Sequence, residues 1–565
     1  MKLSYQHANP STGGGSYLLR FRDEPEQRTA CVLVDSGVGV DLDSMLRDDE
    51  YLAAVLLTHA HLDHYASLSD SLRHGAPVYA AEPTANALED VLNEGEKNYE
   101  IGASDGVLDA LEPLDGWTTL VPDVEAAPIP AGHAPGAAGF VVRFEDGTRT
   151  NTVLFTGDFT TRRVAGFPGI PTDVSTGADV LFVNVSTTDE FEETLSNSLF
   201  TIVERAQAGS PVLVTASGLT GVHYAYLLGH LGESLAESIP VTLAGQAAKL
   251  YADFEYDVPN VETVPVFDDP SELLERGTVT VARPEVPKEG GARRLFDVVE
   301  DDSSATLVQL TGGATNPIET AACTVYDFEI VNHPSIPVID DLVTTVDPIH
   351  VVAGHGPRRT LRKFRGRYDE RFVWASDDDR EQTLYADGWW SPPPWLSETA
   401  IQSIRARDWR SKGLRLDDFE GEDRSLPAIA PADEPDLEAE GVAVERFEGR
   451  FGERDDADLP VVESSADPVL DSSASEPASP DSTASEPPAS ESPATDHPDL
   501  DDAEAFRAEV LDRLESLEAR LADSGIPVRA RVVDGGDCVT FLRLMGDVDL
   551  EHGEEVEVVL AGDEE

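Results

Sequence analysis

The chain has 565 residues and a formal net charge of −67, because 108 Asp and Glu residues face only 41 Lys and Arg residues. The apolar content of 40% excludes disorder of the whole chain, and the length predicts roughly two to four domains. No apolar run reaches the roughly 18 residues of a membrane span, and residues 1–7 lack a signal-peptide pattern. The three cysteines have neither disulfide nor metal spacing, which indicates a reducing cytoplasm (Cys31, Cys323 and Cys538).

From residue 1 to about residue 415, short β-rich apolar runs alternate with helical patterns. This alternation predicts a mixed α/β fold. The expected strands include residues 16–20, 30–34, 53–57, 152–155, 180–183, 211–214 and 349–352.

The composition changes after this region. Residues 463–499 hold ten Ser, seven Pro and nine acidic residues, with no Lys, Arg or aromatic residue. Such a segment buries too little apolar surface to offset the entropy of ordering, and its charges repel one another. We therefore expect an acidic, Ser/Pro-rich disordered linker over residues 416–502.

Residues 503–565 read as a small helix-plus-β module. The expected helix, 503–522, places Val510 and Leu517 on one heptad position and Leu514 and Leu521 on another. Two heptads fit either a coiled coil that joins copies of the chain or a helix packed on its neighbour. Residues 529–560 then alternate as strands do.

The most informative segment is Thr58-His59-Ala60-His61-Leu62-Asp63-His64, which directly follows the expected strand 53–57. Two His side chains at positions i and i+2 leaving a strand point the same way and can share one metal ion. The Asp and His that follow, at the turn into a helix, can face a second ion. Imidazole and carboxylate ligands without a thiolate suit Zn²⁺.

Three more candidate ligands each follow an apolar strand and stand in a Gly-containing loop. They are His133, Asp158 and His355. Loops at strand ends are a usual place for active-site groups in layered α/β folds. Singly, each residue fits a buried polar group or a turn former equally well. Together with the first motif they complete a set of seven.

These motifs resemble those of the metallo-β-lactamase fold hydrolases, in which an αββα sandwich carries two zinc ions. Segments 13–19 and 33–37 also match the opening strands of that fold and its supporting Asp, which is Asp35 here. The resemblance implies that one Zn²⁺ is held by His59, His61 and His133. It implies that the second is held by Asp63, His64 and His355, and that Asp158 bridges both. Asp35 would orient the loop that carries the ligands.

The spacing of 355 − 158 = 197 residues between two of these ligands is long for this fold. A long insertion at this place resembles that of the β-CASP nucleases, which carry a second α/β domain over the zinc site. We therefore expect core parts at 1–190 and 321–415 around an inserted domain at 191–320. His333 resembles the phosphate-facing His of that group. One departure is Val185, which stands where the group has an acidic residue before Ser-Thr.

Residues 358–415 are locally basic, with 13 Lys and Arg against nine Asp and Glu, and hold five of the six Trp residues. Arginines on phosphates and aromatic rings under bases are the components of single-strand binding. A solvated helix face with a Trp/Pro cap packed on the core is the alternative. The candidate RNA contacts are Arg358, Arg359, Arg362, Lys363, Arg365 and Arg367.

The sequence thus predicts a zinc-dependent phosphodiesterase that resembles β-CASP nucleases of the mRNA 3′-end-processing-factor type. Two Zn²⁺ would activate water for attack on phosphorus, with Asp63 orienting it and His333 stabilising charge. The expected partner is RNA, or single-stranded DNA, in the cytoplasm and without a membrane. The acid-rich, Lys-poor composition resembles that of salt-loving archaea. Two alternatives remain: a thioesterase or lactonase of the same fold, and a non-catalytic RNA-processing scaffold.

Overall fold

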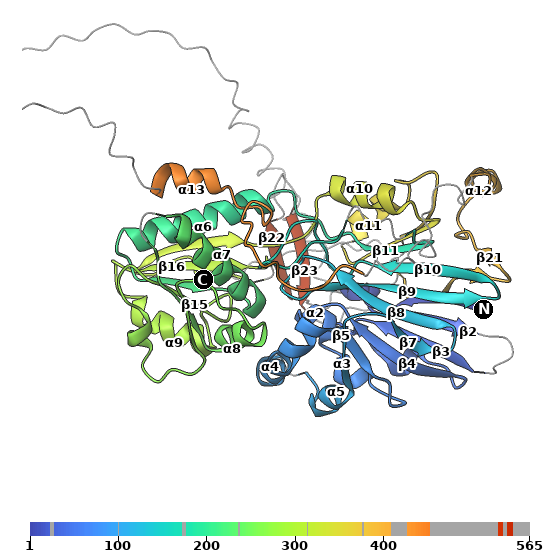
Figure 1. The fold of residues 1–565 in the computed structure, drawn as a ribbon, viewed down its shortest axis with the longest axis horizontal. Coiled ribbons are helices and arrows are strands. Elements are labelled where there is room, and N and C mark those ends of the chain that lie inside the picture. Colours follow the sequence, from blue (N-terminus) through green and yellow to red (C-terminus); the bar gives the residue numbers. More distant parts are fainter. Residues whose placement is uncertain are drawn as a thin grey trace, which may run out of the picture. The chain divides into compact units, whose positions relative to one another are not determined.

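The computed structural model divides the chain into two compact units, Met1–Pro460 and Val461–Glu565. It describes residues 1–22, 28–99, 101–171, 177–235, 238–313, 315–356, 358–375, 378–407, 426–451, 529–534 and 540–545. The first unit contains three sheets, and Figure 1 shows the arrangement of their strands and helices.

The first sheet has eight strands in the order β21-β20-β1-β2-β3-β4-β5-β6. Its N-terminal strands are antiparallel, whereas β3, β4, β5 and β6 run parallel to one another. The strands are β1 (Lys2–His7), β2 (Tyr17–Arg22), β3 (Thr29–Val34), β4 (Glu50–Leu57), β5 (Val78–Ala81), β6 (Leu111–Leu114), β20 (Gln382–Ala386) and β21 (Trp389–Trp390).

The second sheet has seven strands in the order β19-β18-β11-β10-β9-β8-β7. Strand β11 pairs in parallel with both β10 and β18, so the ends of these three strands meet at one edge. The strands are β7 (Thr118–Val121), β8 (Val124–Pro130), β9 (Ala138–Asp146), β10 (Arg149–Phe155), β11 (Val180–Asn184), β18 (His350–Gly354) and β19 (Phe372–Trp374).

Aromatic side chains from both sheets form one buried cluster between them. Tyr5 of the first sheet packs edge-on against Phe182 of the second, with ring centroids 5.2 Å apart, and Phe182 stacks on Phe155. Burial of large rings is the main favourable contribution to packing of this kind. Trp374 and Trp390, from the basic, Trp-rich stretch, belong to the same cluster. In residues 358–415 these two Trp side chains therefore pack on the core, as the alternative to RNA binding expected.

Helices cover the outer faces of the two sheets, so the predicted sandwich and mixed α/β class are confirmed (Figure 1). The helices of this core are η1 (Pro10–Thr12), α1 (Leu42–Met45), α2 (Leu62–Tyr65), α3 (Leu68–Ser71), α4 (Glu82–Asn98), α5 (Asp105–Ala110), α10 (Ile336–Val346), α11 (Arg358–Phe364) and α12 (Glu398–Arg405).

The third sheet is built from a segment inserted between β11 and β18. Its six strands are all parallel, in the order β14-β13-β15-β12-β16-β17. They are β12 (Val212–Thr215), β13 (Val241–Ala244), β14 (Val261–Val264), β15 (Val279–Ala282), β16 (Thr306–Thr311) and β17 (Thr324–Glu329). The accompanying helices are α6 (Phe191–Gln207), α7 (Gly218–Ser234), α8 (Gln246–Asp253), η2 (Pro270–Leu273) and α9 (Gly290–Val299).

The inserted domain is longer than the sequence suggested. We expected it to end at residue 320, but β17 pairs with β16 along its whole length and completes the sheet. The segment therefore runs to Glu329, because the partly buried apolar residues of this edge strand pack against the inserted core.

The predicted linker is wrong for residues 426–451, which we call the strap. We expected disorder over 416–502, yet the strap folds onto the first unit and ends in α13 (Val444–Phe451). Phe447 is fully buried and packs against Phe200 of α6. The apolar residues scattered among its acids supply buried surface that offsets the entropy of ordering. Residues 416–425 and 452–502 lie outside the described residues.

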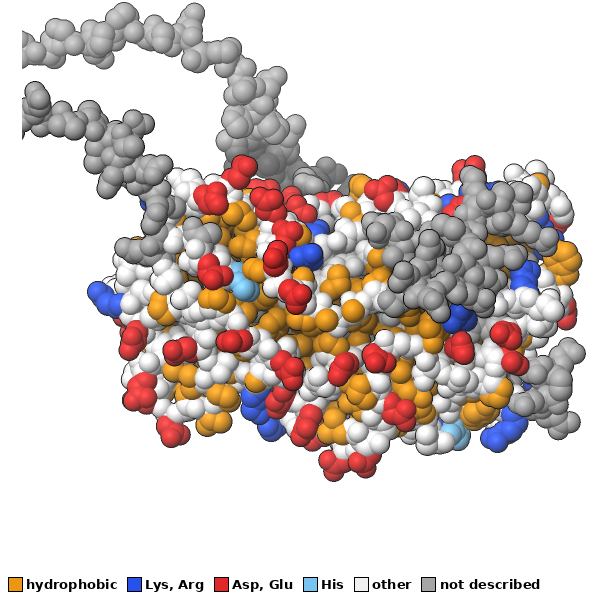
Figure 2. Space-filling model, in the orientation of Figure 1, with side chains coloured by type: hydrophobic (Ala, Val, Ile, Leu, Met, Phe, Trp, Pro, Cys, Tyr) orange, Lys and Arg blue, Asp and Glu red, His pale blue; other side chains and the backbone are white. Residues whose placement is uncertain are grey.

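In the second unit the structure describes one antiparallel pair, β22 (Arg529–Asp534) and β23 (Thr540–Met545). These strands fall within the expected β module, whereas the expected helix 503–522 lies outside the described residues. No helix in the described part of the chain has the length and apolar character needed to cross a bilayer. Figure 2 shows Asp and Glu side chains spread over one face of the molecule, with fewer Lys and Arg among them.

Candidate metal centre

The motif Thr58–His64 lies between the end of β4 and the short helix α2 and includes the start of that helix. Strand β4 is buried at its C-terminal half, and the chain then turns through Thr58–His61 into α2, which carries Asp63 and His64. A neighbouring loop holds α2 in place, since the Ser36 backbone N–H donates to the His64 carbonyl oxygen at 2.8 Å. Gly37 is required here because a side chain at this position would collide with the backbone carbonyl oxygen of Asp63.

His59, His61 and His133 form the first cluster of ring nitrogens. His61 Nδ1 lies 3.0 Å from His59 Nε2 and 3.1 Å from His133 Nε2. His59 is fully buried at the strand end, and His133 reaches the same point from the loop after β8. Three imidazoles from two distant segments thus converge as the family resemblance implied.

Asp158 lies between this cluster and the remaining ligands. Its Oδ2 atom is 3.3 Å from His64 Nε2 and 3.7 Å from His133 Nε2, and its Oδ1 atom is 3.4 Å from His355 Nε2. Asp63 approaches His64 from the open side, with Oδ2 at 3.8 Å from His64 Nε2. All seven predicted ligands are therefore brought together, with Asp158 in the central position expected of a bridging carboxylate.

Hydrogen bonds to the outer nitrogens of the rings fix which nitrogen faces the centre. Asp35 Oδ2 accepts from His64 Nδ1 at 2.8 Å, and its Oδ1 accepts the Thr58 backbone N–H at 2.8 Å. The Asn332 carbonyl oxygen accepts from His133 Nδ1 at 2.7 Å. In both rings this hydrogen bond occupies Nδ1 and leaves Nε2 directed at the centre, as in most metal-binding histidines.

The backbone at two of these positions adopts a conformation that non-glycine residues rarely take. Asp35 has a φ of 55° and His355 a φ of 51°, both in the left-handed region. Such conformations cost free energy and persist where the surrounding structure holds them, which is common at functional sites.

The donor set fits metal ions. The Nε2 atom of His64 is buried without a hydrogen-bond partner and faces the Asp158 carboxylate. The donor atoms of His59, His61 and His133, all imidazole, lie within 4.8 Å of one another, and so do those of Asp63, His64, Asp158 and His355, which combine imidazole with carboxylate. This is the ligand chemistry of zinc, and a cation would satisfy lone pairs that otherwise point at one another.

The electrostatics of the centre favour the metal-binding form of His59, His61 and Asp158. Burial, reinforced by the neighbouring imidazoles, lowers the pKa of His59 far below its ordinary value and lowers the pKa of His61 to about 4. Burial alone would raise the pKa of Asp158, but His355 and His64 outweigh it and hold that pKa well below the ordinary value. Burial alone would lower the pKa of His64, but Asp35, Asp63 and Asp158 raise it well above its ordinary value, so a cation bound at this ring would displace a proton.

His333 lies beside the cluster. Its ring centroid is 4.9 Å from that of His133 and 6.0 Å from that of His355, and its Nδ1 atom has no hydrogen-bond partner. Burial lowers the pKa of His333 to about 3, so the ring is neutral near pH 7. The structure therefore places this residue within reach of a group bound at the centre.

Sequence reasoning missed Asn184 and Asn332. Asn184 ends β11, and its Nδ2 donates to Asp158 Oδ1 at 2.7 Å. Since β11 runs parallel to β10, its last residue lies next to the loop of Asp158, and this adjacency was the available signal. Asn184 directly precedes Val185, which stands where the β-CASP group has an acidic residue, so a polar side chain is still present at this strand end. Asn332 acts through a backbone oxygen, which no side-chain pattern reveals.

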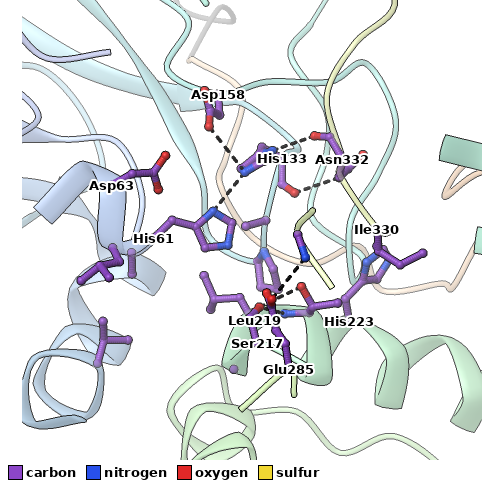
Figure 3. Close-up of a pocket in the computed structure, with 18 of the residues that line it drawn as sticks. His61, Asp63, His133, Asp158, Ser217, Leu219, His223, Glu285, Ile330 and Asn332 are labelled. Atoms are coloured by element: carbon purple, nitrogen blue, oxygen red, sulfur yellow. Dashed lines mark hydrogen bonds and ion pairs between the residues drawn. The ribbon is translucent and has the colours of Figure 1, made fainter. Parts of the chain in front are cut away.

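The centre opens into a cleft of about 540 Å³ between the core and the inserted domain. Figure 3 shows His61, Asp63, His133 and Asp158 on one side of it, and Ser217, Leu219, His223 and Glu285 of the inserted domain on the other.

The predicted RNA contacts on and after α11 do not line this cleft. Arg367 pairs with Asp340, and Arg365 donates to the Ala375 carbonyl oxygen and lies over Trp395. Arg359, Arg362 and Lys363 are exposed to solvent. The Arg358 side chain lies outside the described residues.

Residues 14–182 match the model of the Metallo-beta-lactamase superfamily. These residues hold six of the seven clustered ligands, all but His355. The chain therefore contains a metallo-β-lactamase domain, here interrupted between β11 and β18 by the inserted domain.

Three curated relatives illustrate what the chain is similar to. It is 32% identical over 157 residues to transcription termination factor FttA of Methanosarcina mazei, covering 24% of each chain. It is 37% identical over 134 residues to ribonuclease TTHA0252 of Thermus thermophilus, covering 22% of this chain and 30% of the relative. It is 34% identical over 90 residues to hydroxyacylglutathione hydrolase of Yersinia enterocolitica, covering 15% of this chain and 35% of the relative. The matches thus span about a third or less of each relative.

Proposed function

We propose that the protein is a zinc-dependent phosphodiesterase that cleaves RNA in the cleft between the core and the inserted domain. The observation that carries this proposal is the convergence of seven imidazole and carboxylate ligands on the wall of an open cleft. A buried metal site with no such opening would serve structure alone.

The proposal assigns two metal positions. His59, His61 and His133 would hold one Zn²⁺, and Asp63, His64 and His355 would hold the other. Asp158 would bridge them, since its two oxygens face imidazoles of both groups. When bound, a zinc pair supplies Lewis acidity, which lowers the pKa of water to about 7 and neutralises charge on phosphoryl oxygens.

Two side chains of the centre would act on the reacting groups. Burial alone would raise the pKa of Asp63, but His64 and other nearby imidazoles hold it below the ordinary value, so the carboxylate is ionised. Its side chain is 55% exposed, toward the cleft, where it would orient the attacking water. His333 would donate a hydrogen bond to a phosphoryl oxygen from the cleft wall.

RNA is favoured over other esters by the inserted domain that forms the opposite wall of the cleft. A similar two-domain arrangement is the β-CASP pattern that the sequence resembles, and a ribonuclease stands among the relatives. On this proposal the protein acts in RNA processing of the 3′-end type. Arg359, Arg362 and Lys363 on α11 would add phosphate contacts outside the cleft, just past His355.

A small-molecule hydrolase is the second candidate, because the chain also matches a hydroxyacylglutathione hydrolase. The two candidates are separated by incubating the zinc-loaded protein with labelled RNA, a thioester and a lactone in parallel, at high salt. We expect cleavage of the RNA alone. Turnover of the thioester or lactone with intact RNA would replace the proposal by the second candidate. A protein that binds zinc and turns over none of the three substrates would be a scaffold.

A further inference from the structure

The wall of the cleft that faces the metal centre carries one basic side chain. Among the described residues that line the cleft, Arg283 is the only Lys or Arg, whereas Asp63, Asp158 and Glu285 contribute carboxylates. In a chain with a net charge of −67, a polyanion can enter such a cleft only where local positive charge offsets this excess. Apart from the metal positions, Arg283 is the group placed to do so.

Arg283 is held in a fixed position after β15. Its Nη2 donates to the Tyr99 hydroxyl at 2.9 Å, its Nη1 donates to Gln246 Oε1, and Nη1 lies 3.3 Å from Glu94 Oε1. A guanidinium has five N–H donors, so these three contacts leave donors for a ligand. The side chain keeps 16% exposure, and Glu94 offsets part of its charge.

Tyr99 stands beside it at the C-terminal end of α4. Its ring is 41% exposed, lines the same cleft, and has the Arg283 guanidinium carbon 5.6 Å from its centroid. A large exposed ring beside an arginine is the arrangement on which single-stranded nucleic acids stack their bases.

We propose that Tyr99 and Arg283 form a nucleotide platform, in which the Tyr99 ring stacks on a base and Arg283 binds the adjacent phosphate. This inference rests on the proposed cleavage of RNA and deepens it. The metal centre would act on one phosphate, while the platform would hold a neighbouring nucleotide against the other wall. Base stacking and one arginine would then provide affinity inside a cleft whose other charged side chains are carboxylates.

The test measures equilibrium binding of a short phosphorothioate-linked single-stranded RNA to the zinc-loaded full chain over a salt series. Arg283→Gln should weaken binding about tenfold and reduce the steepness of the log–log salt dependence by about 0.7, the value for one phosphate contact on a single strand. Tyr99→Ala should weaken binding about tenfold for the base-bearing RNA and have little effect on the same backbone without bases. Glu94→Gln should strengthen binding, since it frees Arg283 of its carboxylate.

Lys249→Gln is the matched control. Lys249 pairs with Asp90 at the same contact between α8 and α4, at 2.9 Å, but does not line the cleft. If Arg283 acted only by tying the two helices together, Lys249→Gln would weaken RNA binding to a similar extent. Such weakening by Lys249→Gln would overturn the platform. Unchanged affinity and salt slope in Arg283→Gln would overturn it too, and so would absence of RNA binding by the wild type.

These outcomes are separate from failure of the proposed function. Cleavage of RNA by a protein whose affinity does not depend on Arg283 or Tyr99 would leave the nuclease proposal standing and remove the platform. Binding that depends on both residues without any cleavage would retain the platform in a protein that is not a nuclease.

Discussion

The two walls of the cleft differ in how their polar groups are supported. On the core wall, four of the seven ligands come from the six residues His59–His64, and rings such as His64 and His133 have dedicated partners on their outer nitrogens. On the opposite wall the polar groups stand singly at the ends of different strands and helices, and one arginine provides the basic charge. Ligands held rigidly by hydrogen-bond partners suit chemistry on a metal ion. The separate contacts of the opposite wall suit recognition of the substrate.

The largest effect should follow from breaking the core wall at its centre. Asp158→Asn removes the charge shared by both proposed metal positions and should abolish hydrolysis, as should His61→Ala, while the protein stays folded. Zinc content and RNA cleavage by the purified variants check this. Unchanged cleavage by folded Asp158→Asn would refute the assignment of the site.

The strap connects the two walls, and its anchor should carry a large stability effect. Glu440 is fully buried, accepts the backbone N–H groups of Ala165 and Gly166 at 2.8 and 2.7 Å, and pairs with His223 of α7 at 2.7 Å. Glu440→Ala leaves these buried donors without an acceptor and should lower the free energy of unfolding by about 3 kcal/mol.

Urea denaturation measures this change, with zinc content as the second readout. Glu438→Ala, which removes an exposed acid of the same strap, serves as control and should have little effect. Equal midpoints for the two variants would show that the strap does not hold the walls together.

A smaller effect should come from the support behind the ligands. In Asp35→Asn the new amide can donate to His64 Nδ1, which moves the ring proton to Nε2 and blocks the lone pair that faces the centre. Zinc affinity should fall about 10- to 100-fold. Competition with a chromophoric chelator measures it, and Asp48→Asn, at an exposed site, is the control. Unaltered zinc affinity would mean that Asp35 serves folding alone.

The smallest effect, taken per pH unit, concerns a histidine of the core that lies apart from the cleft. His350 is fully buried, accepts from Trp374 Nε1 at 2.8 Å, and burial lowers its pKa to about 3. Between about pH 6.5 and pH 3 the unfolded chain binds a proton here that the folded chain does not, so stability falls as the pH is lowered. His350→Phe should remove about 1.4 kcal/mol per pH unit from this slope. Parallel stability–pH curves for wild type and variant would contradict it.

The difference between the walls also explains what the sequence could predict. The ligands of the core wall were recognisable because His59–His64 are adjacent and because His133, Asp158 and His355 each follow an apolar strand. Parallel strands then bring the ends of β10, β11 and β18 to one edge. These local patterns singled out all seven positions, and the αββα sandwich was predicted from the family that the motifs resemble.

The platform depends on a contact between the two walls, since Arg283 follows β15 of the inserted domain and Tyr99 ends the core helix α4. Arg283 and Tyr99 are 184 residues apart, and neither belongs to a motif. Composition misled at the strap, whereas the RNA contacts that it suggested after His355 stay a prediction. The acidic strap folds because a few apolar residues and the satisfied carboxylate of Glu440 anchor it. The basic stretch after His355 uses Trp374 and Arg367 for packing and pairing rather than for lining the cleft.

The central claim is that this centre, loaded with metal, cleaves RNA. The most direct measurement removes metal from the wild-type chain with a chelator and follows cleavage of labelled single-stranded RNA while zinc is added back. We predict no cleavage without metal and activity that saturates at about two zinc ions per chain. Cleavage that persists after metal removal, or none at any zinc level, would contradict the account.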